Sequence, residues 1–260
     1  MCWIIKVLML CCTGGCLNLK MLVTTEAIAL SSKKYSESSL IIKALTRSDG
    51  VKSYLVRGVR SKKNKGLSPA LFQALTILDI EAFHKNKGGL ESIRSAKISN
   101  PFQSIPYNIS KNSITLFISE LLNICIKEEG KNDNLFEFIK SSFLWLDMSD
   151  NFQNFHLHFI TKLLKYLGIS PSVNIKETND FDFINGTFIK SDEKNRVLPK
   201  NIVKGFYNFL GTNFDYYEES INSSKKRKEF LEFIMNYLEY HIESFKRPKS
   251  LNILYDLFQA

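Results

Sequence analysis

The stretch "MLVTTEAIALSSKKYSESSLIIKALTRSDGVKSYLVRGV", residues 21–59, decides the fold class. It contains three short segments rich in β-branched and aromatic residues, at 22–30, 38–46 and 51–59, and the turn signal SDG at 48–50 separates the last two. Two further segments of this kind follow, LTILDIEAF (75–83) and LESIRSAKI (90–98), with the turn signal NKGG between them. Five short strands in about eighty residues are typical of a small barrel or a curled sheet.

Beyond residue 105 the pattern changes to that of helices. The segment SKNSITLFISELLNICIKEE (110–129) has apolar residues at helical spacing, and Ser110 is placed to cap it. Similar patterns occupy 133–148, 151–168, 199–211, 223–245 and 250–258. Within 171–200, Asn185-Gly186 between apolar residues predicts a hairpin. We therefore expect an α+β multidomain chain: an N-terminal OB-fold β-barrel over 21–105, then an α-helical domain over 106–260 with a small hairpin insertion at about 171–200.

The first twenty residues do not fit this plan. Their apolar run of roughly ten residues is too short to span a bilayer, and they resemble a poor signal peptide in which TGGC approaches a lipoprotein cleavage box. We expect a leader outside the fold or a mis-set start, with Met21 as the true first residue. Four of the five cysteines lie in this segment, which leaves Cys125 alone in the main body as a small apolar residue. A body without disulfides suits the cytoplasm.

The net charge of +9 is concentrated in one part of the chain. Residues 21–110 carry 14 Lys and Arg against 6 Asp and Glu, whereas residues 111–260 carry 19 against 20. A local excess of this kind attracts polyanions. A membrane surface would normally call for a basic amphipathic helix, which this block lacks, so nucleic acid is the expected partner.

No catalytic constellation is recognisable in the sequence. It has no phosphate-binding glycine loop and no dinucleotide fingerprint. His156 and His158 are two positions apart on an expected helix and cannot bind one metal together. The carboxylate pairs Glu128-Glu129 and Glu218-Glu219 are interpreted as solvated acids. The chain is therefore expected not to be an enzyme.

The basic block remains as the candidate site. Its cations are interleaved with Tyr35, Tyr54, Phe72 and Phe83, which could stack on bases or could form the barrel core. The expected nucleic-acid-binding residues are Lys33, Lys34, Arg57, Arg60, Lys62, Lys63 and Lys65. A second basic run, KKRK at 225–228, is either a charged helix start or a secondary contact.

With these features assembled, the sequence resembles the RecO family of bacterial recombination mediators. The resemblance covers Met21 to Phe258 and rests on TEAIALSSKKYSESSLIIKALTRSDG, LVRGVRSKKNKG, QSIPYNISKNSITLFISELL, NFHLHFITKLLKYLGISP and YLEYHIESFKRPKSLNILYDLF, in this order and spacing. It implies an OB-fold and a helical body, binding of single- and double-stranded DNA, annealing of strands coated by single-stranded-DNA-binding protein, and loading of RecA together with RecR. It also implies a DNA-facing barrel rim that carries Arg57, Arg60, Lys62, Lys63 and Lys65.

The sequence departs from the family in one respect. Many members have a four-cysteine zinc module after the position of YLGISP, but residues 171–200 contain no cysteine. We therefore expect no zinc and no other cofactor, with the hairpin held by packing.

Two other hypotheses compete with a DNA-annealing mediator in the cytoplasm, associated with the nucleoid. The chain could be a protein-interaction adaptor whose helical body recruits partners while the basic loop is incidental. It could also be a lipid-anchored envelope protein, a reading that depends wholly on the leader and on Cys16.

Overall fold

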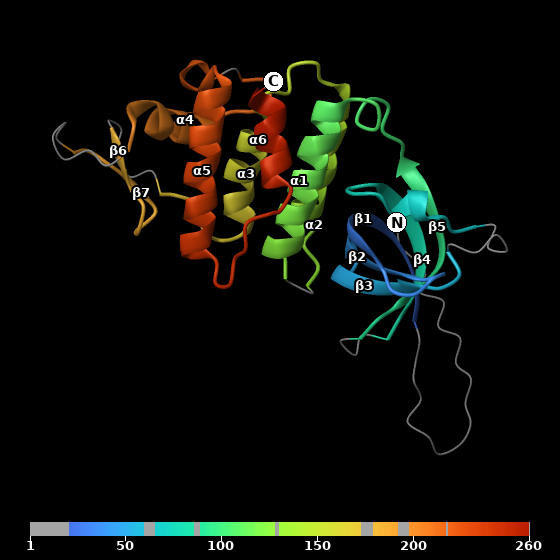
Figure 1. Ribbon diagram of the computed structural model, residues 1–260. Helices are drawn as coiled ribbons and strands as arrows, with labels where there is room; N and C mark the ends of the chain where they lie inside the picture. The colour runs from blue at the N-terminus through green and yellow to red at the C-terminus, as the bar shows by residue number, and fades with distance from the viewer. Residues whose placement is uncertain are drawn as a thin grey trace, which may run out of the picture.

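The first half of the chain folds into a five-stranded antiparallel barrel. The computed structural model describes residues 21–59, 66–85, 89–127, 130–172, 179–191, 198–216 and 218–259. The strands are β1 (Met21–Lys34), β2 (Leu40–Thr46), β3 (Gly50–Val56), β4 (Ile77–His84) and β5 (Ser92–Asn100). They are hydrogen-bonded in the order β3-β2-β1-β4-β5, and a parallel bridge between Tyr54 and Glu91 brings β3 to the entrance of β5. Figure 1 shows this barrel at one side of the molecule.

The five expected strands are confirmed, and β1 is longer than the sequence indicated. It runs for 14 residues and changes register between Ala29 and Ser31, a bulge that lets one strand bend around the barrel and pair with both β2 and β4. Residues of alternating strand positions, such as Ile42 and Ile80, fill the interior. A short 3₁₀ helix, η1 (Pro69–Phe72), lies in the connection between β3 and β4, and its Phe72 is buried in the same core.

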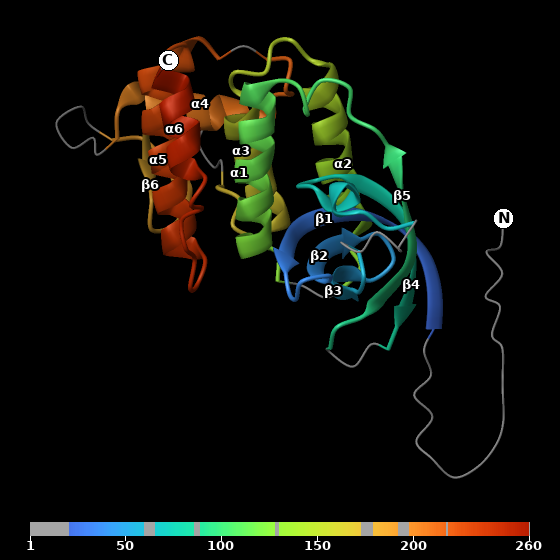
Figure 2. The same ribbon diagram turned by 45° about the vertical axis from the view of Figure 1, so that its right-hand side comes forward.

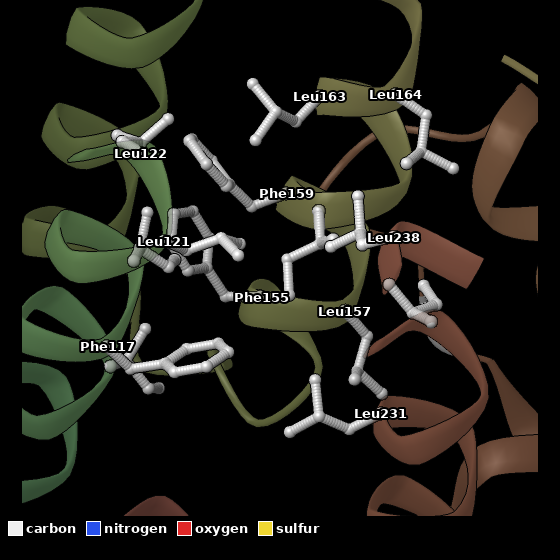
Figure 3. Close-up of a cluster of buried hydrophobic side chains, with 14 of the residues drawn as sticks. Phe117, Leu121, Leu122, Phe155, Leu157, Phe159, Leu163, Leu164, Leu231 and Leu238 are labelled. Atoms are coloured by element: carbon white, nitrogen blue, oxygen red, sulfur yellow. The ribbon is translucent and has the colours of Figure 1, made fainter. Parts of the chain in front are cut away.

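The second half is a helical body, and Figure 2 shows it beside the barrel. Its helices are α1 (Ile109–Cys125), α2 (Asp133–Met148), α3 (Phe155–Tyr166), α4 (Lys200–Gly211), the 3₁₀ helix η3 (Glu219–Ile221), α5 (Ser224–His241) and α6 (Leu251–Gln259). In Figure 3, Phe117 and Leu121 of α1 face Phe155 and Phe159 of α3, and Leu238 of α5 approaches from the other side. All five side chains are buried. Burial of one such side chain stabilises the fold by about 1.5–3 kcal/mol. The expected fold class, an OB-fold barrel followed by a helical domain with a hairpin insertion, is confirmed.

The expected cap of α1 was wrong by two residues. Asn108, not Ser110, is the N-cap, and its side chain accepts a hydrogen bond of 3.0 Å from the backbone N–H of Lys111. Both residue types cap helices well, so composition does not choose between them. The chain turns at Pro106 and Tyr107, and this turn sets the first helical residue at Ile109.

The predicted hairpin is present as β6 (Asp180–Asp182) and β7 (Thr187–Ile189). Its turn places Gly186 at φ +63°, a left-handed conformation that favours glycine. A Cβ at this position would lie 2.7 Å from the Tyr237 hydroxyl of α5, so the missing side chain also permits close contact. Phe181 and Phe188 pack against Phe206 of α4, and the hairpin is therefore held by apolar contacts.

The histidines of α3 belong to the core. His156 and His158 are fully buried. Burial lowers the pKa of His156 to about 3, with the nearby positive charge of Arg227 acting in the same direction. Burial likewise lowers the pKa of His158 to about 4. Both rings are therefore neutral near pH 7 and serve as packing groups. Glu218, interpreted from the sequence as a solvated acid, is instead buried and accepts hydrogen bonds from Asn208 and Ser220.

A buried carboxylate fixes the link between barrel and helical body. Asp147, near the end of α2, accepts hydrogen bonds from three successive backbone N–H groups of the linker, those of Gln103 (2.7 Å), Ser104 (2.8 Å) and Ile105 (2.9 Å). Burial raises the pKa of this carboxyl, but the backbone hydrogen bonds outweigh burial and the net pKa is lowered. The side chain of Lys111 donates to Ser104 Oγ (2.7 Å) and joins the same cluster.

A second set of polar contacts joins β1 and the residue that follows β2 directly to α2. Glu26 accepts from Arg47 and from Lys140, each at 2.6 Å, and Arg47 also pairs with Glu137. Burial opposes ionisation of Glu26, but the hydrogen bonds from Lys140 and Arg47 lower its pKa overall. The guanidinium of Arg47 lies 4.6 Å from the ring centre of Phe136. These side-chain contacts join the barrel to the helical body independently of the linker.

Candidate nucleic-acid interface

The turn between β1 and β2 and the C-terminal end of β3 lie at the same end of the barrel. Lys34 at the end of β1 pairs with Leu40 of β2, and Leu40 pairs with Val56 of β3. Because neighbouring strands lie about 4.8 Å apart, the backbones at Lys34 and Val56 are roughly 10 Å apart. Arg57 follows Val56 directly. We call this end, with Lys33, Lys34, Tyr35 and Arg57, the barrel rim.

The side chains of the barrel rim are exposed. Lys33, Lys34 and Arg57 all face solvent, and Tyr35 is 62% exposed. A tight turn positions the tyrosine, because its backbone N–H donates to the carbonyl of Ser39 at 3.0 Å. The rim thus combines cations that can contact phosphates with an aromatic face on which a base can stack.

Of the seven residues predicted to bind nucleic acid, the structure brings three together. These are Lys33, Lys34 and Arg57. The other four, Arg60, Lys62, Lys63 and Lys65, lie outside the described residues. Gly58, which follows Arg57, has a φ of +67°, a left-handed conformation that favours glycine.

Three of the four candidate stacking residues are partly or wholly removed from solvent. Tyr54 is fully buried, and its hydroxyl lies 2.9 Å from His84 Nε2. The other ring nitrogen of His84 is 3.2 Å from the Asp49 carboxylate. Burial raises the pKa of Tyr54, with the Asp49 charge adding to it. Phe72 is also buried and Phe83 is half-buried. Tyr35 is therefore the aromatic residue of this set that can meet a base at the rim.

Lys43, a member of the basic block, has a structural contact. Its ammonium donates to the carbonyls of Asn123 (3.0 Å) and Ile126 (3.4 Å) at the C-terminal end of α1. Burial lowers its pKa, and the charges of Lys33 and Lys127 lower it further. Lys43 thus satisfies the carbonyls at the end of a helix, where a cation is favourable.

The same contact reveals a cation that sequence reasoning missed. Lys127 is exposed and near enough to Lys43 to affect its pKa, so the end of α1 adds a positive charge to the surroundings of Lys43. In Figure 2 the lower end of α1 lies beside the barrel. No local pattern could have found Lys127, because it follows a helix far along the chain and is brought to the barrel only by packing.

The second basic run, KKRK at 225–228, lies at the start of α5, in agreement with its interpretation as a charged helix start. Ser223 caps the helix through a 3.4 Å bond from the Lys226 backbone, and Lys225 and Lys228 are exposed in the first turns. Lys228 lies 4.8 Å from the ring centre of Tyr255. Figure 1 shows α5 on the side of the helical body away from the barrel.

An antiparallel sheet in the order β3-β2-β1-β4-β5, curled so that β3 is bridged to the entrance of β5 and followed by a helical body, defines a protein of the OB-fold class. Comparison with known proteins gives the family. The family model "Recombination protein O N terminal" matches residues 21–102, and "Recombination protein O C terminal" matches residues 106–251. The chain therefore belongs to the RecO family of DNA repair proteins.

Individual relatives agree with this assignment. The chain is 41% identical over 238 residues to the DNA repair protein RecO of Flavobacterium psychrophilum, 38% identical to that of Flavobacterium johnsoniae and 36% identical to that of Christiangramia forsetii. Each alignment covers 92% of this chain and 100% of the relative.

Within the described ranges, no helix is both long and apolar enough to cross a membrane. Within the same ranges, no group of three or more His, Cys, Asp or Glu side chains is arranged to hold a metal ion. The expectation that the chain works without zinc stays a prediction.

Proposed function

We propose that this protein binds single- and double-stranded DNA through the barrel rim, anneals complementary strands and, with RecR, helps to load RecA. The observation that carries the proposal is the rim itself, where Lys33, Lys34 and Arg57 are exposed beside Tyr35. Four further cations, at positions 60–65, follow Arg57 closely in the sequence.

The proposed mechanism is non-catalytic. Lysine and arginine side chains bind phosphates without reading sequence and release counterions, so affinity falls steeply with salt. Two strands neutralised on one basic surface repel each other less and can pair. Tyr35 holds a base away from its neighbours and keeps it accessible to a complementary strand.

The partners follow from membership in the family and remain part of the proposal. They are RecR, single-stranded-DNA-binding protein and, indirectly, RecA. We also propose that the protein acts in the cytoplasm at the nucleoid, has no enzymatic activity and requires no zinc or other cofactor.

The rim is tested by binding of a fluorescent single-stranded oligonucleotide across a salt series. A variant with Lys33, Lys34 and Arg57 changed to Gln loses three phosphate contacts. The slope of log K against log salt should therefore become shallower by about 2, at roughly 0.7 per contact. The matched control changes three exposed lysines far from the rim, Lys165, Lys204 and Lys246, to Gln and should keep the slope of the wild type. Equal slopes in both variants would exclude the rim as the phosphate-binding surface.

A protein-interaction adaptor remains the second candidate, and an uncharged hollow between barrel and α1 supports it. The hollow has a volume of about 430 Å³ and no charged residue in its lining. Ile98 of β5 and Leu116 of α1 line it and are 42% and 45% exposed. Ile98→Ser with Leu116→Ser should abolish binding of purified RecR and leave DNA binding intact if the adaptor function is correct. If RecR does not bind at the hollow, the double variant should still bind RecR.

A further inference from the structure

A pocket of about 420 Å³ lies at the start of α3 and α5, apart from the barrel rim. The connection from α2 to α3, the chain before η3 and the first turn of α5 line it. Its volume falls in the range of small-ligand sites, about 300–1,000 Å³. The α5 helix, which carries the second basic run, is separated from the barrel by α1 and α2 (Figure 1). The pocket and the rim are therefore two different surfaces.

The apolar wall of the pocket is built from fixed aromatic rings. Phe214 packs on Phe155, with ring centres 5.0 Å apart, and on Trp145, with ring centres 5.3 Å apart. Tyr216 lines the pocket and is 40% exposed. Its backbone carbonyl lies 3.4 Å from Nε2 of the buried His158. A planar ligand would therefore meet an aromatic surface that packing already holds in place.

The polar wall offers a hydrogen-bond acceptor that the protein does not use. Asn154 is the N-cap of α3, yet its side chain makes no capping bond. Its Oδ1 atom is buried, and among the described residues no group donates to it. Buried polar atoms nearly always have a partner, so this oxygen points to a donor that comes from a ligand or from water.

Positive charge lies at the opposite wall. Arg227, in the first turn of α5, lines the pocket and donates to Ser224 Oγ at 3.2 Å. Lys225, Lys226 and Lys228 flank it along the helix start. A guanidinium at this position suits a phosphate, and the neighbouring lysines suit the phosphates on either side.

One carboxylate in the lining distinguishes between two kinds of polyanion. Asp215 lines the pocket and accepts a 3.0 Å hydrogen bond from Trp145 Nε1. A carboxylate repels any anionic group, but a nucleotide can keep its phosphate at Arg227 and place beside Asp215 a neutral base, whose amino or imino groups donate hydrogen bonds to the carboxylate. Aromatic walls, an unused acceptor, a carboxylate and an arginine together match a nucleotide better than an acidic peptide.

We infer that this pocket binds one nucleotide of a single-stranded nucleic acid, with the base against Tyr216 and Phe214 and a phosphate at Arg227. The inference rests on the proposed function for its ligand class, but not on the barrel rim for its binding. The protein would then hold single-stranded DNA at two separate surfaces.

Trp145 provides a built-in reporter. The chain has two tryptophans, so Trp3→Phe in the full chain leaves Trp145 as the single one, in contact with the pocket wall. Titration with tetrathymidylate should change the emission of Trp145 and saturate. Tyr216→Ala should weaken this binding about tenfold or more, since stacking on an aromatic side chain contributes strongly to single-strand affinity. Tyr216→Phe should retain it, and Arg227→Gln should weaken it. The matched control is Tyr240→Ala, another exposed tyrosine, near the other end of α5.

The test separates the pocket from the rim. In the variant with Lys33, Lys34 and Arg57 changed to Gln, the Trp145 response should be unchanged even if overall DNA affinity falls. A response lost in this variant, or no response to tetrathymidylate, would overturn the inference. A response unaffected by Tyr216→Ala would also overturn it, as would a response to an aspartate-rich peptide of equal charge but not to tetrathymidylate.

Discussion

Removal of the Asp147 carboxylate should destabilise the protein through the linker between barrel and helical body. The carboxylate accepts from three successive backbone N–H groups, at Gln103, Ser104 and Ile105. A hydrogen bond to a charged group contributes about 1.5–3 kcal/mol net. In Asp147→Ala, water can replace the partner of the exposed Gln103, but Ile105 is buried and its N–H would be left without one.

We therefore expect Asp147→Ala to lower the free energy of unfolding by about 3 kcal/mol. For a chain of this size, that loss corresponds to a fall in Tm of roughly 6–12 °C. Urea denaturation followed by circular dichroism measures the first quantity and calorimetry the second. Asp150→Ala, which removes an exposed carboxylate three residues away, is the matched control and should stay within about 0.5 kcal/mol of the wild type.

The pH dependence gives an independent check on the same contact. The pKa of Asp147 is lowered in the folded state. Its stabilising effect is therefore fully present above the unfolded-state pKa of about 3.9 and is lost as the pH falls through the folded-state value. The stability difference between wild type and Asp147→Ala should shrink in acid. A difference below 0.5 kcal/mol at pH 7, roughly the effect of a surface change, would refute the reasoning.

Three further predictions concern the helical body. Gly186→Ala should cost about 1–3 kcal/mol in unfolding free energy, because of its positive φ and the contact with Tyr237; an unchanged urea midpoint would contradict this. His156, with a pKa of about 3, should make the protein about 2 kcal/mol less stable at pH 5 than at pH 7, since the unfolded histidine takes up a proton and the folded one does not. His158 should act in the same direction, and the double change to Gln should flatten the dependence; an equally steep profile would show that neither ring is responsible. Burial raises the pKa of Cys125 to about 12, so wild type and Cys125→Ala should react alike with a thiol reagent at pH 7.5 until urea unfolds them. An extra fast-reacting thiol in the folded wild type would contradict the prediction that Cys125 is unreactive there.

Local patterns predicted the fold where one short-range rule dominates. The strands of the barrel, the hairpin at Asn185-Gly186 and the end of α3 shortly before Gly168 all follow from residue preferences within a few positions. The cap of α1 was misplaced because Asn108 and Ser110 are equally suitable by composition. The turn that precedes the helix decides which of the two residues becomes the N-cap.

The candidate site could be predicted only in part. Exposure of Tyr35 and burial of Tyr54 depend on which face of a strand or turn each side chain takes, and both tyrosines looked alike in the sequence. Lys43 belonged to the basic block by position, yet its ammonium binds the carbonyls of α1, some eighty residues away. Long-range contacts of this kind, like that of Asp147 with the linker, leave no local signal.

We propose above that the barrel rim holds strands so that they can pair. The most direct measurement is the rate at which two complementary oligonucleotides anneal, followed by energy transfer between end labels. The wild type should accelerate annealing, the variant with Lys33, Lys34 and Arg57 changed to Gln should lose most of this acceleration, and the variant with Lys165, Lys204 and Lys246 changed to Gln should keep it. Equal annealing rates with the two variants would contradict the claim.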